Sequence, residues 1–318
     1  MNRFIPDPFI PILLATVALA SLFPASGAAA DHLGTAATAA VMLLFFLHGL
    51  KLPRENLVAA LVNWRLHLFI LGTTYLVFPL VGIALVRLWP SLLPADLWAG
   101  VLFLCALPST VQMSIAFTSM ARGNVAAAVT SAAASNLLGI VLTPLIAGAL
   151  LHAQGGEVSP AGIWKVVRVL LLTFVAGHLL RPWLAEWAAR RKQLISWSDR
   201  LTILLSVYSA FSQAVIDGIW SRIPITTLLV TVAVCALMLS IVMLFASTGA
   251  RLAGFPRDEQ RSALYCGAFK SVVSGVPMAR VLFPSAEIGA MILPLMMYHQ
   301  LQMMVSATLA PRQAKQEP

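Results

Sequence analysis

Two short stretches rich in serine, glycine and proline interrupt otherwise apolar sequence and decide the fold of the chain. Residues 104–114 read LCALPSTVQMS, and residues 265–277 read YCGAFKSVVSGVP. Each contains a cysteine beside a small residue, and these cysteines, Cys105 and Cys266, lie 161 positions apart in a chain of 318 residues. Proline and glycine weaken a helix at the point where they stand. The sequence therefore predicts two interrupted helices at corresponding positions of two halves.

The chain around these stretches is too apolar for a soluble domain. Hydrophobic residues make up 59% of the sequence and charged residues 10%, whereas soluble globular domains have about 45–50% and about 25%. A disordered chain, a collagen-like chain and a disulfide scaffold each need a different composition. We therefore predict an all-α polytopic membrane protein.

Ten apolar runs approach the length of about 20 residues that a transmembrane helix needs. We predict them at residues 8–25, 33–51, 66–88, 97–120, 124–151, 163–185, 200–219, 224–248, 262–283 and 286–309. With the N-terminus inside, 15 of the 21 basic residues fall on the inner side, 5 fall on the outer side, and Lys270 lies within a span. Cytoplasmic loops carry an excess of lysine and arginine, so both termini are predicted to be cytoplasmic.

The first run allows a second interpretation. Arg3, the apolar residues after it and the small residues at 28–30 resemble a cleavable signal peptide. Four prolines in the run and the acidic residue Asp7 favour a retained helix instead. We expect the helix to be retained, and its removal stays open.

The longest inner connection is the basic stretch Arg190–Arg200, near the middle of the chain. We interpret it as the seam between two halves of five predicted helices each, with the halves assigned to residues 1–160 and 161–318. An odd number of helices places the two halves in opposite orientations. Such an inverted repeat is a recurring plan of secondary transporters.

Polar residues gather in and around the two interruptions. Backbone groups within a bilayer must be paired or must face protein or a water-filled cavity, and the ends of half-helices can hold ions. We therefore predict a substrate or ion site here, formed by Ser109, Thr110, Gln112, Ser114, Ser131, Ser135, Asn136, Lys270, Ser271, Ser274, His299 and Gln300. Serines in membrane helices also join helices by hydrogen bonds, and this structural role stays open.

Lys270 is the most costly of these residues to bury. A charge at the centre of the bilayer costs about 2.5–3.5 kcal/mol on insertion scales. Its ammonium could bridge exposed carbonyl groups of two crossing broken helices, neutralise an anionic substrate or carry a coupled proton. These roles do not exclude one another.

Several other functions lack the residues they need. The sequence has no P-loop, no HExxH motif and no GxSxG motif, which argues against ATP-driven transport and against an enzyme. Cys105, Cys235 and Cys266 show no CxxC spacing, so we expect no metal site. The net charge of +9 is not arranged as a basic stripe with aromatic residues, so we expect no nucleic-acid partner. No cofactor is expected.

Several motifs together resemble the bile acid:sodium symporter superfamily, in its bile-acid-symporter-like (SBF-like) branch. The carrying residues are PSTVQ at 108–112, ARGNVA at 121–126, SNLL at 135–138, LTP at 142–144, FFLHGLK at 45–51 and the second interruption at 266–277. The resemblance covers the whole chain in layout. It implies a core domain of helices 3–5 and 8–10, with helices 4 and 9 broken and crossing, and a panel domain of helices 1, 2, 6 and 7.

The same resemblance implies a function and a location. Typical members move organic anions together with sodium by alternating access. We therefore expect a symporter-like secondary transporter of a small or amphipathic organic anion in a bacterial inner membrane. Its expected partners are the bilayer and the anion, and a homodimer stays open. The alternatives are a non-transporting membrane regulator or scaffold that keeps the fold, and a membrane enzyme.

The sequence departs from the family where sodium ligands are expected. Aligned on the ARGN motif, these ligands fall on Ser114 and Ile115 in the fourth helix and on Ala128 and Ala132 in the fifth. In the ninth helix Lys270 stands in a region without an acidic residue. We therefore expect the Lys270 ammonium to replace a bound sodium ion. This makes sodium coupling doubtful and leaves proton coupling or facilitated transport.

Overall fold

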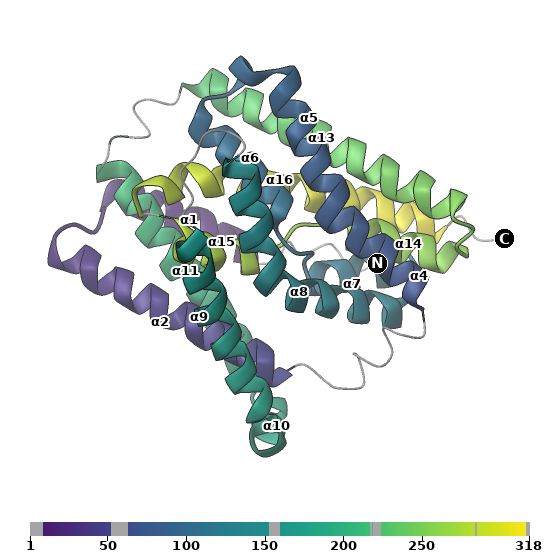
Figure 1. Cartoon of the computed structure of the whole chain (residues 1–318), viewed down its shortest axis with the longest axis horizontal. Coiled ribbons are helices and arrows are strands. Elements are labelled where there is room, and N and C mark those ends of the chain that lie inside the picture. The colour runs from purple at the N-terminus through teal and green to yellow at the C-terminus, as the bar shows by residue number, and fades with distance from the viewer. Residues whose placement is uncertain are drawn as a thin grey trace. The chain divides into compact units, whose positions relative to one another are not determined.

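The computed structural model describes residues 9–51, 63–152, 160–216, 218, 224–283 and 285–315 (Figure 1). Every regular element in these ranges is a helix, which confirms the all-α class. Arg3 and Asp7, which precede the first predicted span, lie outside the described residues, as do Arg54 and Arg222 of the charge count.

The helices form two compact units, each made of three chain segments. Unit 1 comprises Met1–Lys51, Val169–Pro224 and Val276–Ala290. Unit 2 comprises Leu52–Arg168, Ile225–Gly275 and Met291–Pro318. Segments from both halves of the chain therefore contribute to each unit.

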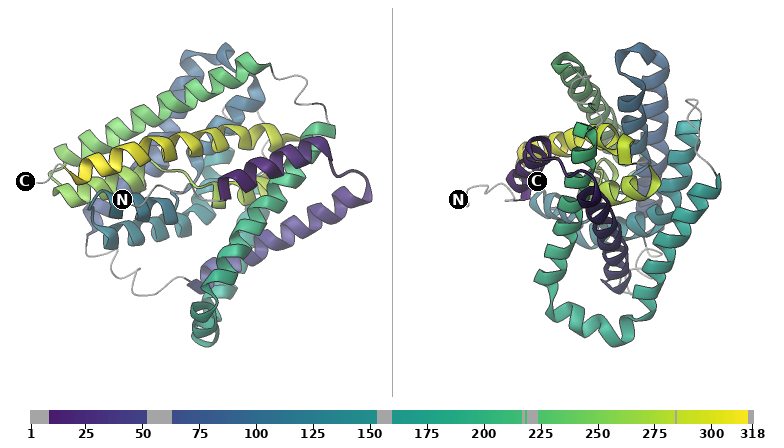
Figure 2. Two further views of the ribbon diagram at one scale, coloured as in Figure 1. Left: turned by 180° about the vertical axis from the view of Figure 1, so that it is seen from behind. Right: turned by 90° about the vertical axis from the view of Figure 1, so that its left-hand side faces the viewer.

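Unit 1 is built around a long helix that packs against the first two helices of the chain. Its elements are α1 (Phe9–Leu22), α2 (Ala28–Lys51), the C-terminal part of α9 (Pro160–Leu179), α10 (Arg181–Arg190) and α11 (Lys192–Ile216). Helix α11 packs against both α1 and α2 (Figure 2). Leu47 and Leu50 of α2 form a buried cluster with Ala188 of α10 and Ile195 of α11.

Two glycines allow α2 and α9 to approach until their backbones touch. A Cβ atom at Gly49 would collide with the carbonyl group of Phe174, and one at Gly177 would collide with the carbonyl group of Phe46. Small residues permit such close packing between membrane helices. This pair of helices therefore has no room for a side chain at either position.

Unit 2 contains the two predicted interruptions. Its elements are α4 (Trp64–Gly72), the π turn η1 (Thr73–Val77), α5 (Phe78–Leu88), η2 (Pro90–Leu92), α6 (Ala95–Ala106), α7 (Gln112–Met120), α8 (Val125–His152), α13 (Ile225–Leu252) and α14 (Arg257–Gly267). Two further helices, α15 (Val272–Leu282) and α16 (Ser285–Ala314), have residues in both units. The first half of unit 2 thus includes a π turn that the sequence analysis did not predict.

Both interruptions are present, and the second lies earlier than the sequence suggested. The first separates α6 from α7 at residues 107–111, and the second separates α14 from α15 at residues 268–271. Gly275 and Pro277 were expected to unwind the helix, but both lie within α15. Gly275 instead serves packing, because a Cβ atom there would meet the side chains of Leu107 and Leu295.

Five helices in the described ranges are long and apolar enough to cross a membrane. They are Ala28–Leu50, Trp64–Leu88, Val125–His152, Ile225–Leu252 and Ile288–Ala314. The fourth and ninth predicted spans fall short of that length because each is divided into two half-helices. The sixth predicted span, 163–185, ends at Leu179 instead, where Pro182 enters the first turn of α10.

The ARGN motif forms the turn between α7 and α8. Arg122 adopts a positive φ of 58°, a left-handed conformation that side chains rarely adopt. The backbone N–H of Gly123 then donates to the carbonyl group of Thr118 over 2.8 Å. The Asn124 side chain accepts from the Ala127 N–H over 3.0 Å and caps α8. The motif is therefore a tight helix connection whose residues have defined geometric roles.

Candidate functional site

Six successive carbonyl groups, from Leu104 to Ser109, lie at the break between α6 and α7. The regular pattern of α-helical hydrogen bonds is interrupted along them. Each of them accepts a hydrogen bond from a donor in unit 2. The donors are the N–H of Leu107 for Leu104, Lys270 Nζ for Cys105 and Leu107, the Thr143 hydroxyl for Ala106, the N–H of Ser271 for Pro108 and the Asn136 amide for Ser109. An unpaired carbonyl group would be costly within a bilayer, so these donors are what makes the break possible.

Lys270 lies at the centre of this arrangement and is fully buried. Its Nζ atom donates to the carbonyl oxygens of Thr74 at 2.9 Å, Cys105 at 2.9 Å and Leu107 at 2.6 Å. An ammonium group has three N–H donors, so all three are used. The Nζ atom also lies 4.0 Å from the centre of the Phe78 ring, within the range of a cation–π interaction.

The carbonyl group of Thr74 is free for Lys270 because of the π turn. In an α-helix its donor would be the N–H of Phe78, but that N–H donates to Thr73 instead. The next residue, Pro79, has no N–H to offer. Thr74 is not among the predicted site residues, because the side chain gives no signal that its backbone carbonyl group acts as an acceptor.

The break between α14 and α15 is held by two residues of α16. Gln302 is buried, and its side chain pairs with the backbone of Lys270, accepting from N–H at 2.9 Å and donating to the carbonyl group at 3.0 Å. The hydroxyl group of Tyr298 donates to the carbonyl group of Ala268 at 2.8 Å. Both residues lie outside the predicted site, although buried polar side chains on a membrane helix are a signal that could have included them.

A hydrogen-bonded chain links the two breaks. The N–H of Ser271 donates to the carbonyl group of Pro108 at 3.0 Å. Ser274 donates from its hydroxyl group to the Asn136 side chain at 2.7 Å, and its N–H donates to the hydroxyl oxygen of Ser271 at 3.1 Å. The Asn136 amide then reaches the carbonyl group of Ser109 at 2.8 Å. Ser271 is thereby the N-cap of α15.

Three other predicted serines serve as links within unit 2. Ser135 accepts from the N–H of Ser109 at 3.0 Å. Ser114 donates to the carbonyl group of Tyr265 at 3.0 Å. Ser131 lies 2.7 Å from the Nδ1 atom of His67. The structural role that the sequence left open is therefore observed for all three.

The remaining predicted residues lie at the edge of this network. Thr110 is buried in the first break, and Gln112 is exposed at the start of α7. His299 is half-buried, and its Nδ1 atom lies 2.9 Å from the side-chain nitrogen of Gln302. Gln300, also half-buried, follows it on α16. The structure thus places every member of the predicted set in unit 2, and Gln112, His299 and Gln300 are more accessible than the buried residues of the breaks.

The chemistry of this centre is that of a site for a single positive charge. Carbonyl oxygens of unwound backbone are ligands for monovalent cations in membrane proteins. Here three such oxygens surround the ammonium of Lys270. In the described part of the chain, no group of three or more His, Cys, Asp or Glu residues could hold a metal ion.

Comparison with known proteins gives a family for this geometry. The sequence model of the SBF-like CPA transporter family matches residues 7–315. The chain is 46% identical to "Uncharacterized protein PA2026" of Pseudomonas aeruginosa, over 98% of this chain and 94% of that protein. It is also 46% identical to "Putative symporter YfeH" of Escherichia coli K12, over 98% and 93%.

A more distant relative carries a more specific name. "Sodium/bile acid cotransporter 7-A" of Xenopus laevis is 26% identical over 98% of this chain and 92% of that protein. The family match over nearly the whole chain confirms the resemblance found in the motifs. The chain, an integral membrane transporter, belongs to the SBF-like CPA transporter family.

Proposed function

We propose that the protein is a secondary transporter that carries a small or amphipathic organic anion by alternating access, with the Lys270 ammonium in the place of a bound cation. The observation that carries this proposal is the donation by Lys270 Nζ to three backbone carbonyl groups beside the two breaks. In secondary transporters, unwound carbonyl groups of this kind coordinate the coupling ion. A tethered ammonium would supply that positive charge permanently.

The surroundings of the expected sodium ligands support a site without sodium. Ala128 belongs to a buried apolar cluster that includes Cys266. Ala132 is fully buried and has no side-chain oxygen, and the Ser114 hydroxyl is engaged with Tyr265. Sodium needs oxygen ligands, so we propose proton coupling or facilitated transport in its place.

The proposal includes ten membrane-crossing segments in two inverted five-helix repeats. Unit 1 holds α1, α2, α10 and α11, and unit 2 holds both breaks, which supports the division into panel and core domains. The unequal division of basic residues supports cytoplasmic termini. The relatives from Escherichia coli and Pseudomonas aeruginosa support a bacterial inner membrane.

The substrate is proposed to contact the accessible members of the predicted site. Gln112 is exposed at the N-terminus of α7, and Asn136 and Gln300 are half-buried. The positive end of a helix dipole at α7 would favour an anion near Gln112. The buried serines serve as the framework of this site.

Thermal unfolding of the purified protein in sodium chloride and in choline chloride tests the role of Lys270. A ligand that binds the folded state raises the apparent stability by mass action. We expect equal midpoints in both salts for the wild type, and a lower midpoint for Lys270→Ala that sodium partly restores. Lys315→Ala, at an exposed lysine outside the site, is the matched control and should respond to neither salt. Specific stabilisation of the wild type by sodium would contradict the proposal.

Uptake into proteoliposomes tests transport itself. Cholate and benzoate serve as an amphipathic and a small probe anion. We expect uptake of at least one above that of protein-free liposomes, unchanged when choline replaces sodium, and lost in Lys270→Ala. Uptake that requires a sodium gradient would contradict the proposed coupling, and equal uptake by the variant would contradict the proposed site.

A further inference from the structure

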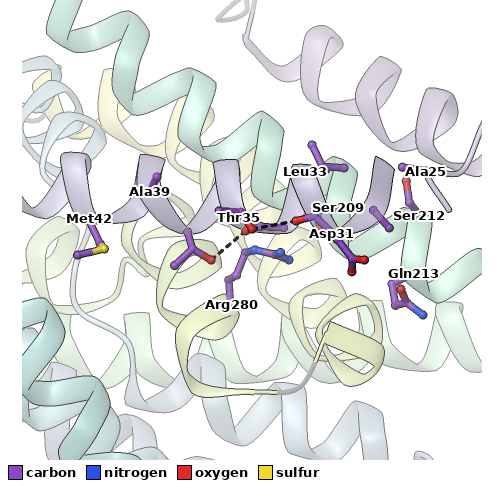
Figure 3. Close-up of a pocket in the computed structure, with 13 residues that line it drawn as sticks. Ala25, Asp31, Leu33, Thr35, Ala39, Met42, Ser209, Ser212, Gln213 and Arg280 are labelled. Carbon is purple, nitrogen blue, oxygen red and sulfur yellow. Dashed lines mark hydrogen bonds between the residues drawn. The ribbon is translucent and has the colours of Figure 1, made fainter. Parts of the chain in front are cut away.

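A cavity of about 590 Å³ lies in unit 1, and none of the residues that form the two breaks lines it. Its polar lining comes from three helices: Asp31, Thr35 and Thr38 of α2, Ser209, Ser212 and Gln213 of α11, and Arg280 of α15 (Figure 3). Sites for small molecules have volumes of about 300–1,000 Å³ and a few polar groups that converge. The cavity is therefore large enough for a small organic molecule.

Arg280 is the basic residue among those that line this cavity. Its Nε and Nη1 atoms are enclosed, and neither has a hydrogen-bond partner among the residues that the structure describes. Gly34 leaves room for the guanidinium group, since a Cβ atom there would lie 2.9 Å from Nη2. An enclosed donor without an acceptor is costly, and a charged one needs an acceptor of opposite charge.

Ser212 adds a second unsatisfied group to the same cavity. Its side chain is buried, with 2% of the residue exposed, and its hydroxyl group has no partner in the described part of the chain. A guanidinium group has donors only, whereas a hydroxyl group can donate to an oxygen. A ligand with oxygen acceptors can satisfy both groups, and the charge of Arg280 favours an oxyanion.

Asp31 limits the charge that such a ligand can carry. It lies in the first turn of α2, is exposed, and lines the cavity together with Arg280 (Figure 3). A carboxylate there stabilises the N-terminus of α2. It would also repel a second negative charge on the ligand, so the cavity suits a single carboxylate on a largely neutral molecule.

We propose that this cavity is a binding site for a small monocarboxylate, with Arg280 as its principal ligand and Ser212 as a second donor. Arginine pairs with a carboxylate through charge-assisted hydrogen bonds of fixed geometry. The site goes beyond the proposed function, because none of the residues around Lys270 takes part in it. The site would depend on the proposed transport function only if its ligand were also the anion that is transported.

Binding of benzoate to the purified full-length protein tests the site. Titration is followed by thermal unfolding, with benzamide as a neutral molecule of nearly the same shape. We expect a saturable rise of the midpoint with benzoate and none with benzamide. Arg280→Gln should weaken benzoate binding at least tenfold, whereas Arg87→Gln, which changes an exposed arginine of α5 in the same way, should leave it unchanged.

Two further variants keep the test decisive if Arg280→Gln does not fold. Ser212→Ala should weaken benzoate binding several-fold, and Asp31→Asn should strengthen it by removing a like charge. Equal binding of benzamide, or unchanged binding in Ser212→Ala, would overturn the proposal. Tighter binding of β-alanine than of benzoate would overturn it in favour of a site for zwitterions. Binding here is measured without transport, so a failure of transport leaves the result intact.

Discussion

The ammonium of Lys270 lies 2.9 Å from the carbonyl oxygen of Thr74, and this contact ties the break before α15 to the π turn between α4 and α5. Each group satisfies a need of the other. The carbonyl group has lost its helical donor, and the ammonium has been removed from water. If one of the two groups is removed, the other is left buried without its hydrogen-bond partner, at a cost in stability.

Lys270→Met is expected to destabilise the protein strongly. The substitution keeps an unbranched side chain but leaves the carbonyl groups of Thr74, Cys105 and Leu107 without this donor. Each unsatisfied buried group costs about 1–3 kcal/mol, so we expect a loss of at least about 3 kcal/mol. Unfolding is measured in sodium-free buffer, with Lys315→Met, at an exposed lysine, as the control. Equal stability of the two variants would contradict the assigned contacts.

Gln302→Ala is expected to loosen the second break. The variant leaves the N–H and the carbonyl group of Lys270 without their side-chain partner. We expect a loss of about 2 kcal/mol or more, from the cost of two unsatisfied backbone groups. Gln300→Ala, two positions earlier on α16, should cost less than about 0.5 kcal/mol. The prediction fails if chemical unfolding gives both variants the same midpoint.

Gly49→Ala and Gly72→Ala are expected to change stability in opposite directions. A Cβ atom at Gly49 collides with the backbone of Phe174, whereas one at Gly72 meets nothing within 4 Å. Overpacking costs about 1–3 kcal/mol, while alanine in place of an unhindered helical glycine gains about 0.5–1 kcal/mol. Thermal unfolding of both variants checks the signs, and a stabilised Gly49→Ala would show that α2 and α9 are not in backbone contact.

The three cysteines are expected to resist modification in the folded protein. Cys105, Cys235 and Cys266 are each fully buried, and none forms a disulfide bond. Accessibility and thiolate formation control the reaction of a thiol. A membrane-permeant maleimide should therefore label none of them until the protein is unfolded in detergent. Mass spectrometry counts the labels, and rapid labelling of the native protein would contradict the burial of these residues.

Several features of the site followed from the sequence alone. Proline and clustered serines marked the first break, and the charge of Lys270 in an apolar run marked a place where carbonyl groups had to be available. One of the roles open to Lys270, the bridging of carbonyl groups of broken helices, is the one observed. These predictions worked because they depend on local backbone chemistry and on the cost of burying a charge.

Other features depend on contacts that no local pattern contains. The free carbonyl group of Thr74 arises from a change of helical register, and Gln302 finds its partner only after α16 packs against the break. The role of a serine is equally hard to predict from the sequence. Its hydroxyl group can form a hydrogen bond with a substrate or with a neighbouring helix, and which of the two it does depends on the fold. The second break lies before Gly275 and Pro277, although such residues weaken a helix, because the structure uses Gly275 for close packing within α15.

The complete pairing of the six carbonyl groups from Leu104 to Ser109 has a mechanical consequence. Their donors are Leu107 in the break itself, two residues of α8, and Lys270 and Ser271 of the second break. Sliding one break past the other would therefore remove the donors of three carbonyl groups at once. In a low-dielectric environment this penalty far exceeds thermal energy. The two breaks are therefore held to each other by hydrogen bonds, and we expect a conformational change to move them together as one rigid piece.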